Sequence, residues 1–238
     1  MKLPLDTYSL KARFLPALIV LTPIVGAASA WVPLEQASLR ALVPVVCLAA
    51  MATLLSHFVR DVGKRREPEL FKGWDGSPSV RYLRHRDDTL PEATKSRYHA
   101  KLGTLVPGVE LPSRRSESAR PDAADSVYAS CCDWLREATR ERPRFGLLFE
   151  ENVGYGFRRN LWAMKGAGIV TASIGLFAGL ARAATNLYES VSPSIESLAV
   201  VLLCIVLLVW WVGRISRAWV AIAADAYARR LLAACDTL

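Results

Sequence analysis

The sequence predicts an all-α membrane protein, in which two transmembrane helical hairpins flank a small, mostly helical cytoplasmic domain. Four apolar stretches occur as two pairs, and a charged, proline-rich block separates the pairs. The chain is 52% hydrophobic and has a mean hydropathy of +0.22, although 22% of its 238 residues are charged. Apolar and charged residues are therefore segregated along the chain, as a bilayer requires.

The four apolar stretches are each long enough, or nearly so, to cross a membrane as a helix. A hydrocarbon core about 30 Å thick takes roughly 20 helical residues, and a helix pairs its backbone polar groups internally. A soluble bundle with buried helices is the rival interpretation, but four such runs exceed what a core of this size would use. The predicted spans are Leu15–Val32, Leu39–Val59, Leu161–Ala181 and Leu198–Val212.

Lys and Arg residues set the predicted orientation. They precede the first and third spans and follow the second and fourth, for example at Lys11, Arg60, Arg158 and Arg214. The positive-inside rule then places both termini and the central block in the cytoplasm. The predicted parts are an N-terminal hairpin (1–59), the cytoplasmic domain (60–160), a C-terminal hairpin (161–213) and a cytoplasmic extension of the last helix (214–238). With this extension, Ser194–Ala234 is expected to be one helix.

The N-terminal apolar run has two interpretations. A basic start, the run itself and Ala28-Ser29-Ala30 fit a cleaved signal peptide. The second span follows at once, however, and favours an uncleaved hairpin. Pro16 and Pro23 are unusual inside a helix of either kind. Cleavage would remove one helix and leave the central block in the cytoplasm.

The polar block is expected to contain two helices. Thr89 and Glu92 have the spacing of a capping box, so the first helix should run from there to about Leu102. The second, Asp122–Arg142, carries apolar residues at helical spacing, which predicts one buried face. Leu105–Pro121, rich in proline and serine, is expected to be a loop between them.

A cluster of cationic and aromatic side chains is the candidate ligand site. Such groups suit phosphates by charge and bases by stacking. Asp87, Asp88 and Glu92 lie close by in the sequence and could pair with the same arginines, so an ion-paired surface or subunit contact is the alternative. The predicted ligand-binding residues are Arg81, Arg84, His85, Arg86, Lys95, Arg97, Tyr98 and His99.

The segment before the third span, Glu150–Asn160, is the candidate coupling element between the domain and the membrane. It combines paired acids, paired arginines and aromatic residues, and Gly154 and Gly156 could let it bend. A rigid collar is equally consistent with this composition. The predicted coupling residues are Glu150, Glu151, Asn152, Tyr155, Arg158 and Arg159.

No motif assigns a reaction. The Gly73–Gly76 spacing lacks the Lys-Ser/Thr of a P-loop, no nucleophile elbow is present, and no C-x-x-C pair supports a zinc or redox site. The sequence therefore predicts no catalytic residue, no metal site and no cofactor. A membrane-tethered hydrolase with His85 and His99 as acid–base groups is kept as an alternative.

Four motifs in and after the block carry a resemblance: Gly73-Trp74-Asp75-Gly76-x-Pro78, Leu83–Asp87, Thr94–His99 and Phe149–Asn160. With these motifs the chain resembles a group of bacterial four-span membrane proteins without an established activity, which are found beside anti-phage defence genes. The resemblance covers the block and little of the spans. It implies a membrane effector that is controlled by a signal, and it supplies no catalytic residues.

The leading functional hypothesis is a membrane effector or pore whose basic domain senses a nucleotide, an oligonucleotide or another anionic signal. Its predicted partners are the lipid bilayer and further copies of the chain, since Gly175–Gly179 is a G-x-x-x-G pair that fits either oligomerisation or packing within one subunit. The alternative is a non-catalytic scaffold that recruits a partner enzyme encoded nearby. The spans carry no charge at mid-membrane, which argues against a coupled transporter.

Overall fold

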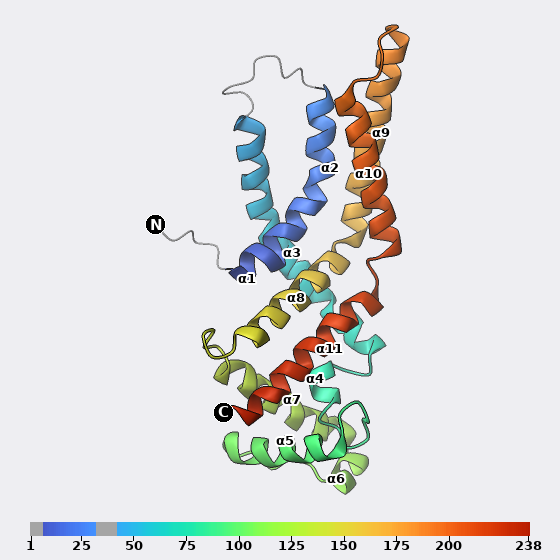
Figure 1. Ribbon diagram of the computed structural model, residues 1–238. Helices are drawn as coiled ribbons and strands as arrows, with labels where there is room; N and C mark the ends of the chain where they lie inside the picture. The colour runs from blue at the N-terminus through green and yellow to red at the C-terminus, as the bar shows by residue number, and fades with distance from the viewer. Residues whose placement is uncertain (1–6, 32–41) are drawn as a thin grey trace. The chain divides into compact units, whose positions relative to one another are not determined.

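The computed structural model describes residues 7–31 and 42–238, with the backbone alone for Thr7 and for residues 42–47. Within these ranges the chain is helical and has no strand (Figure 1). It divides into two compact units, which we call the apolar unit (residues 1–66 and 156–220) and the polar unit (residues 67–155 and 221–238). The boundaries fall inside three helices, α3 (Leu42–Gly73), α8 (Gly146–Ala163) and α11 (Arg217–Ala233).

Three helical stretches of the apolar unit are long and apolar enough to cross a membrane. They are Leu10–Trp31, which comprises η1 (Leu10–Phe14) and α2 (Leu15–Trp31), then α9 (Lys165–Tyr188) and α10 (Ile195–Gly213). They coincide with the first, third and fourth predicted spans. The predicted second span, Leu39–Val59, begins outside the described residues, and its described part is the start of α3.

Glycines on α9 let the neighbouring spans approach closely. A Cβ on Gly168 would overlap the Trp211 ring of α10, and one on Gly175 would lie 2.8 Å from the Cys204 sulfur and 2.9 Å from the Pro23 carbonyl oxygen of α2. Such small residues allow the backbone-to-backbone approach that is common in membrane helices. Within the described chain, the G-x-x-x-G pair therefore serves packing inside one subunit.

The last helix is not continuous, which corrects the prediction of one helix over Ser194–Ala234. Helix α10 ends at Gly213 and α11 begins at Arg217. The ammonium group of Lys165 donates to the carbonyl oxygens of Val212 at 3.3 Å and Ile215 at 2.8 Å. A cation therefore satisfies carbonyls that the break leaves without helical partners.

Pro16 has a direct consequence for the first span. Ala12 lies in the π-helix η1, where the Leu15 N–H donates to the Leu10 carbonyl five residues earlier, and the α-helix α2 follows. Proline has no N–H, so Pro16 can donate neither to the carbonyl of Lys11, five residues earlier, nor to that of Ala12, four residues earlier. The Asn160 side chain of α8 donates to the Ala12 carbonyl at 2.6 Å, and Asn160 is fully buried. Its oxygen accepts from Arg159 at 3.2 and 3.3 Å. A Cβ on Gly63 of α3 would collide with the same amide, so a glycine is needed at this crossing.

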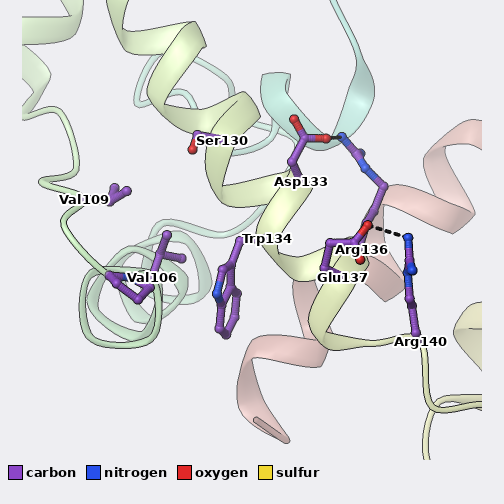
Figure 2. A pocket seen from close by; sticks show the side chains of 9 residues that line it. Val106, Val109, Ser130, Asp133, Trp134, Arg136, Glu137 and Arg140 are labelled. Atoms are coloured by element: carbon purple, nitrogen blue, oxygen red, sulfur yellow. Dashed lines mark hydrogen bonds and ion pairs between the residues drawn. The ribbon is translucent and has the colours of Figure 1, made fainter.

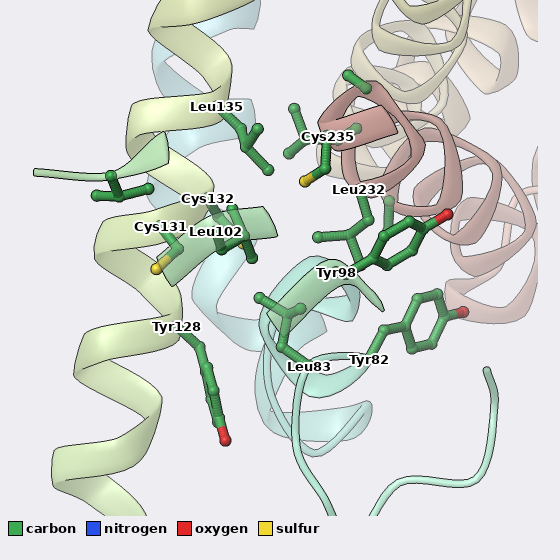
Figure 3. Packing of buried hydrophobic residues seen from close by; sticks show 14 of the residues in the cluster. Tyr82, Leu83, Tyr98, Leu102, Tyr128, Cys131, Cys132, Leu135, Leu232 and Cys235 are labelled. Atoms are coloured by element: carbon green, nitrogen blue, oxygen red, sulfur yellow. The ribbon is translucent and has the colours of Figure 1, made fainter. Parts of the chain in front are cut away.

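The polar unit is built around one hydrophobic core (Figure 3). Short helices α4 (Pro78–Arg81), α6 (Arg114–Ala119) and η2 (Ala234–Asp236) accompany α5 (Glu92–Leu105) and α7 (Pro121–Ala138). The core takes side chains from α5, α7, α11 and the turn after α4, including Tyr82, Leu83, Tyr98, Leu102, Tyr128, Cys131, Cys132, Leu135, Leu232 and Cys235.

Several predicted helix ends are wrong in the polar unit. Helix α5 begins at Glu92 after Pro91 without a side-chain cap, and the backbone N–H of Thr89 donates to the carboxylate of Asp87. It also continues through Gly103 to Leu105. Helix α7 ends at Ala138 rather than Arg142, because the helix gives way to a turn before Pro143.

Two predicted irregular segments are helical. The expected loop Leu105–Pro121 contains α6, whose start is capped by the Ser113 hydroxyl accepting from the Ser116 N–H. The segment Glu150–Asn160, whose composition fits either a bend or a rigid collar, lies wholly within α8. Gly156 does not bend this helix; a Cβ there would lie 2.7 Å from the Tyr8 hydroxyl and 3.2 Å from the Ala12 Cβ. It permits close packing instead.

The pairing of Asn160 with the Ala12 carbonyl predicts a measurable coupling with Pro16. In Asn160→Leu a buried carbonyl loses its donor, which should lower the free energy of unfolding by about 2 kcal/mol. In a Pro16→Ala background the same substitution should lower the free energy of unfolding by less than about 1 kcal/mol, because the new N–H at position 16 can donate to the Ala12 carbonyl. Thermal or denaturant unfolding in micelles measures both.

The matched control is Asn152→Leu, on the same helix, because Asn152 makes no side-chain hydrogen bond among the described residues. Its effect on stability should be small and independent of Pro16. Equal costs of Asn160→Leu in the two backgrounds would contradict the role assigned to Pro16.

Candidate functional site

The Arg84 guanidinium is the centre of the predicted ligand site, and it is buried at 4% exposure. Its Nε and Nη2 donate to the two carboxylate oxygens of Asp125 at 2.8 and 2.6 Å. Its Nη1 donates to the carbonyl and the carboxylate of Asp75, both at 2.7 Å. The hydrogen bond to Asp125 is the main cause that raises the pKa of Arg84. This arginine therefore joins α7 to the turn after α3.

The turn after α3 is shaped to receive that arginine. Asp75 and Gly76 have φ values of 58° and 108°, in the left-handed region that glycine adopts without strain. A Cβ on Gly76 would lie 2.9 Å from the Nη2 of Arg84. The glycines, proline and aspartate of Phe71–Pro78 predict a tight loop, and the structure has one after Gly73, whereas Phe71–Gly73 is the end of α3. Gly76 allows the close approach of a side chain rather than of a phosphate.

Three further buried groups hold the loop between Leu83 and Asp88. Lys95, at 1% exposure, donates to the carbonyls of Asp87 and His85. Glu117 accepts from the backbone N–H groups of His85 at 2.8 Å and Arg86 at 3.3 Å, and from the Tyr128 hydroxyl at 2.8 Å. Burial raises the pKa of Glu117, but these hydrogen bonds together outweigh it and leave the pKa below its ordinary value.

The two histidines lie together and share one kind of partner. Their rings meet edge to face with 4.8 Å between the centroids. The Nε2 of His85 pairs with the Pro112 carbonyl at 2.9 Å, and that of His99 with the Leu83 carbonyl at 2.7 Å. A carbonyl only accepts, so each Nε2 carries the proton. Burial lowers the pKa of His99, against the hydrogen bond to Leu83, which raises it.

The remaining predicted ligand residues differ in exposure. Arg81 donates to the Trp74 carbonyl and pairs with Asp87 at 3.2 Å. Arg86 and Arg97 keep 56% and 52% of their side-chain surface exposed. Arg97 pairs with Asp236 and lies over the ring of the buried Tyr98. The predicted residues thus lie on α4, on α5 and on the loop between them. Of this set, only the guanidinium groups of Arg86 and Arg97 are largely open to solvent, and they lie 3.8 Å from the Asp75 carboxylate and 3.0 Å from the Asp236 carboxylate, respectively.

The predicted coupling residues fall into two sets along α8. In the polar unit, the Tyr155 hydroxyl donates to Glu67 of α3 at 2.7 Å, and its ring stacks on Tyr227 of α11. In the apolar unit, Arg158 donates to the Trp219 carbonyl of α11 at 3.0 Å, and Arg159 contacts Asn160. Glu150 is exposed and Glu151 and Asn152 are half-buried, with no ion pair or side-chain hydrogen bond among the described residues.

Sequence reasoning missed an open pocket of about 650 Å³ in the polar unit. Trp134, Val106 and Val109 provide an apolar wall (Figure 2). On α7, Asp133 pairs with Arg136, and Glu137 pairs with Arg140 at 2.6 Å. The charges that line the pocket are thus mutually neutralised. The three-residue spacing of each acid and its arginine is the only signal that the sequence offered.

The described residues give little support to redox or metal chemistry. No group of three or more His, Cys, Asp or Glu side chains comes together there as a metal site would need. Burial raises the pKa of Cys132 and of Cys235 to about 12, so both thiols are protonated at neutral pH. These cysteines are part of the hydrophobic core.

A scan against protein-family models and searches of curated proteins and of solved structures find no match for this chain.

The pairing of Arg84 predicts that this residue supports the fold. Arg84→Met leaves Asp125 and Asp75 without their shared donor and should lower the free energy of unfolding of the polar unit by about 2–3 kcal/mol. Arg115→Met is the matched control, because Arg115 is exposed and unpaired among the described residues. Denaturant unfolding followed by near-UV circular dichroism measures both. Unchanged stability in Arg84→Met would refute the assignment.

His99 predicts a loss of stability in mild acid. Its folded-state pKa lies below the ordinary value of 6.5, so the unfolded chain takes up a proton first as the pH falls. The free energy of unfolding should therefore decrease below about pH 6.5, and His99→Gln should remove that part of the slope. Glu117 also contributes to the free energy of unfolding, but this contribution is lost only at lower pH, because the ordinary pKa of glutamate is 4.5 and the folded protein lowers it further. Urea titrations at several pH values measure the free energy of unfolding of the wild type and of His99→Gln. If this free energy changes equally with pH in both proteins between pH 5 and 6.5, burial does not lower the pKa of His99.

Proposed function

We propose that the protein is an integral membrane effector with four spans, whose polar unit lies in the cytoplasm of a bacterial cell and senses an anionic signal. The second of these four spans includes the start of α3. Met51, Leu54 and Phe58 are 53%, 74% and 56% exposed and lie three or four residues apart, so they form one apolar face. A large exposed apolar face of this kind suits contact with lipid or with further copies of the chain.

The observation that carries this proposal is that the same three helices meet in each unit. In the polar unit Glu67, Tyr155 and Tyr227 join α3, α8 and α11. In the apolar unit Trp162 of α8 is contacted by Arg66 of α3 and Arg217 of α11. Because the backbone passes between the units within these helices, a change that shifts them in the polar unit has a covalent path to the spans.

The sensing surface in this proposal is the exposed part of the predicted ligand cluster. Arg86 sits on the loop that Lys95 and Glu117 hold, and its guanidinium is largely exposed. Arg97 is exposed on the neighbouring helix α5. A nucleotide or oligonucleotide phosphate would find preorganised cations there. The resemblance to proteins found beside anti-phage defence genes fits such a triggered effector, acting as a homo-oligomer.

A scaffold that recruits a partner enzyme is the second candidate function, and the pocket beside Trp134 favours it. This pocket presents a half-buried aromatic ring and apolar side chains between paired charges, as protein-binding surfaces often do (Figure 2). A hydrolase has less support, because the Nε2–H groups of His85 and His99 are both committed to backbone carbonyls.

Dye release from liposomes tests the effector proposal. Purified protein should release dye only when ATP or a short oligonucleotide is added, and Arg86→Glu should raise the concentration of nucleotide needed by about tenfold or more, because a charge-assisted hydrogen bond is lost. Arg115→Glu changes an exposed arginine outside the cluster and should respond like the wild type. Protein that inserts but releases no dye with any nucleotide would reject the effector in favour of the scaffold.

A further inference from the structure

We propose that the apolar unit binds the headgroup phosphate of an anionic phospholipid, at the end of α9 and α10 where basic residues collect. The site is centred on Trp162, the penultimate residue of α8. Its ligand class is a phosphodiester that carries acyl chains. The site is separate from the sensing surface of the polar unit.

Two guanidinium groups converge on one indole ring. The Arg66 guanidinium carbon lies 4.5 Å from the centroid of the Trp162 ring, and that of Arg217 lies 5.9 Å from it. Trp162 is 6% exposed and therefore fixed. Arg66 is further held by its Nη1, which donates to the Ala163 carbonyl at 3.0 Å. Arg66 and Arg217 come from α3 and α11, so the pair is formed by the fold rather than by the local sequence.

The charge of Arg217 is not neutralised by the protein. The residue is exposed, and no carboxylate of the described chain lies within ion-pair distance of it. The segments Arg60–Arg66, Arg158–Lys165 and Arg214–Arg217 carry four, three and two Lys or Arg residues against a single acid, Asp61. A guanidinium binds phosphate oxygens in a forked geometry, so an anionic phosphate suits the exposed Arg217.

The surroundings select a lipid over a soluble phosphate. Trp162 and Trp219 lie just outside α9 and α10, where tryptophans concentrate at membrane interfaces. Arg158 lies over the Trp219 ring at 5.0 Å, which repeats the pairing of a cation and an indole. On the adjoining part of α10, Val209 and Val212 are 68% and 64% exposed and offer an apolar surface to acyl chains. Juxtamembrane Lys and Arg attract anionic headgroups at such positions.

Native mass spectrometry of the full chain in a neutral detergent tests the site. Phosphatidylglycerol should bind more tightly than phosphatidylcholine with the same acyl chains. Arg217→Gln should weaken phosphatidylglycerol binding about fivefold, the equivalent of about 1 kcal/mol. Arg217 makes no hydrogen bond among the described residues, and its guanidinium carbon lies 5.9 Å from the centroid of the Trp162 ring, so the unfolding temperature of this variant should change little and is measured alongside. Arg66→Gln should act in the same direction, with its unfolding temperature measured alongside, and Arg115→Gln in the polar unit should change nothing.

Three results would overturn the proposal. The first is equal phosphatidylglycerol affinity in the wild type and in Arg217→Gln. The second is an equal loss in Arg115→Gln, which would show attraction to the net charge of the chain. The third is binding of inorganic phosphate as tightly as the lipid, which would indicate a soluble anion. The proposal rests on the membrane location of α9 and α10 and not on nucleotide sensing, so intact nucleotide-dependent dye release beside absent lipid binding would reject the lipid site alone.

Discussion

A single buried hydrogen bond, from the Asn160 amide to the Ala12 carbonyl, fixes how α8 meets the first span. Pro16 makes the bond necessary, because proline removes the helical donor for that carbonyl. The fully buried Asn160 supplies the donor, and its own oxygen accepts from Arg159. Gly63 makes room for the amide at the crossing with α3. A proline in the first span, a glycine in α3 and an asparagine in α8 are thus parts of one arrangement.

In the polar unit, too, buried groups are tolerated because they have hydrogen-bond partners, and here those groups are charged. A buried guanidinium or ammonium group must be fully paired to be tolerated. Arg84 uses all its donor nitrogens on Asp125 and Asp75, and Lys95 uses its ammonium group on backbone carbonyls. The motif residues around positions 73–99 therefore organise the loop from Leu83 to Asp88. They hold the backbone of Arg86 in place, and its guanidinium, like that of Arg97, is largely open to solvent.

How far the sequence predicts this structure depends on the range of the interactions. The spans are predictable because length and hydropathy are local properties, and Leu10–Trp31, α9 and α10 coincide with predicted spans. The tight turn at Asp75–Gly76 is predictable from its glycines. The partners of Arg84 are not, since Asp125 lies 41 residues away and local charge patterns favour nearer acids.

Helix ends and the candidate site show the same limit. The capping-box spacing of Thr89 and Glu92 did not predict the start of α5, which follows Pro91. The break between α10 and α11 has local signals, Gly213 and Ser216, whose hydroxyl accepts from the Trp219 N–H, but the long helix-prone run around them outweighed these signals in the prediction. Gly154 and Gly156 suggested a hinge, yet α8 runs through both, because packing against Tyr8 and Ala12 needs a glycine at position 156. The convergence of Arg66 and Arg217 on Trp162 joins three separate helices and leaves no pattern in the sequence.

The central claim is that α8 is one continuous helix, tied to α3 and α11 in each unit, and not a flexible tether. Backbone hydrogen exchange of the full chain in lipid nanodiscs measures this directly. The account predicts uniformly slow exchange from Glu150 to Trp162, including Gly154 and Gly156, because every amide there has a helical partner. Exchange at Gly154–Arg158 that is much faster than on either side would contradict it.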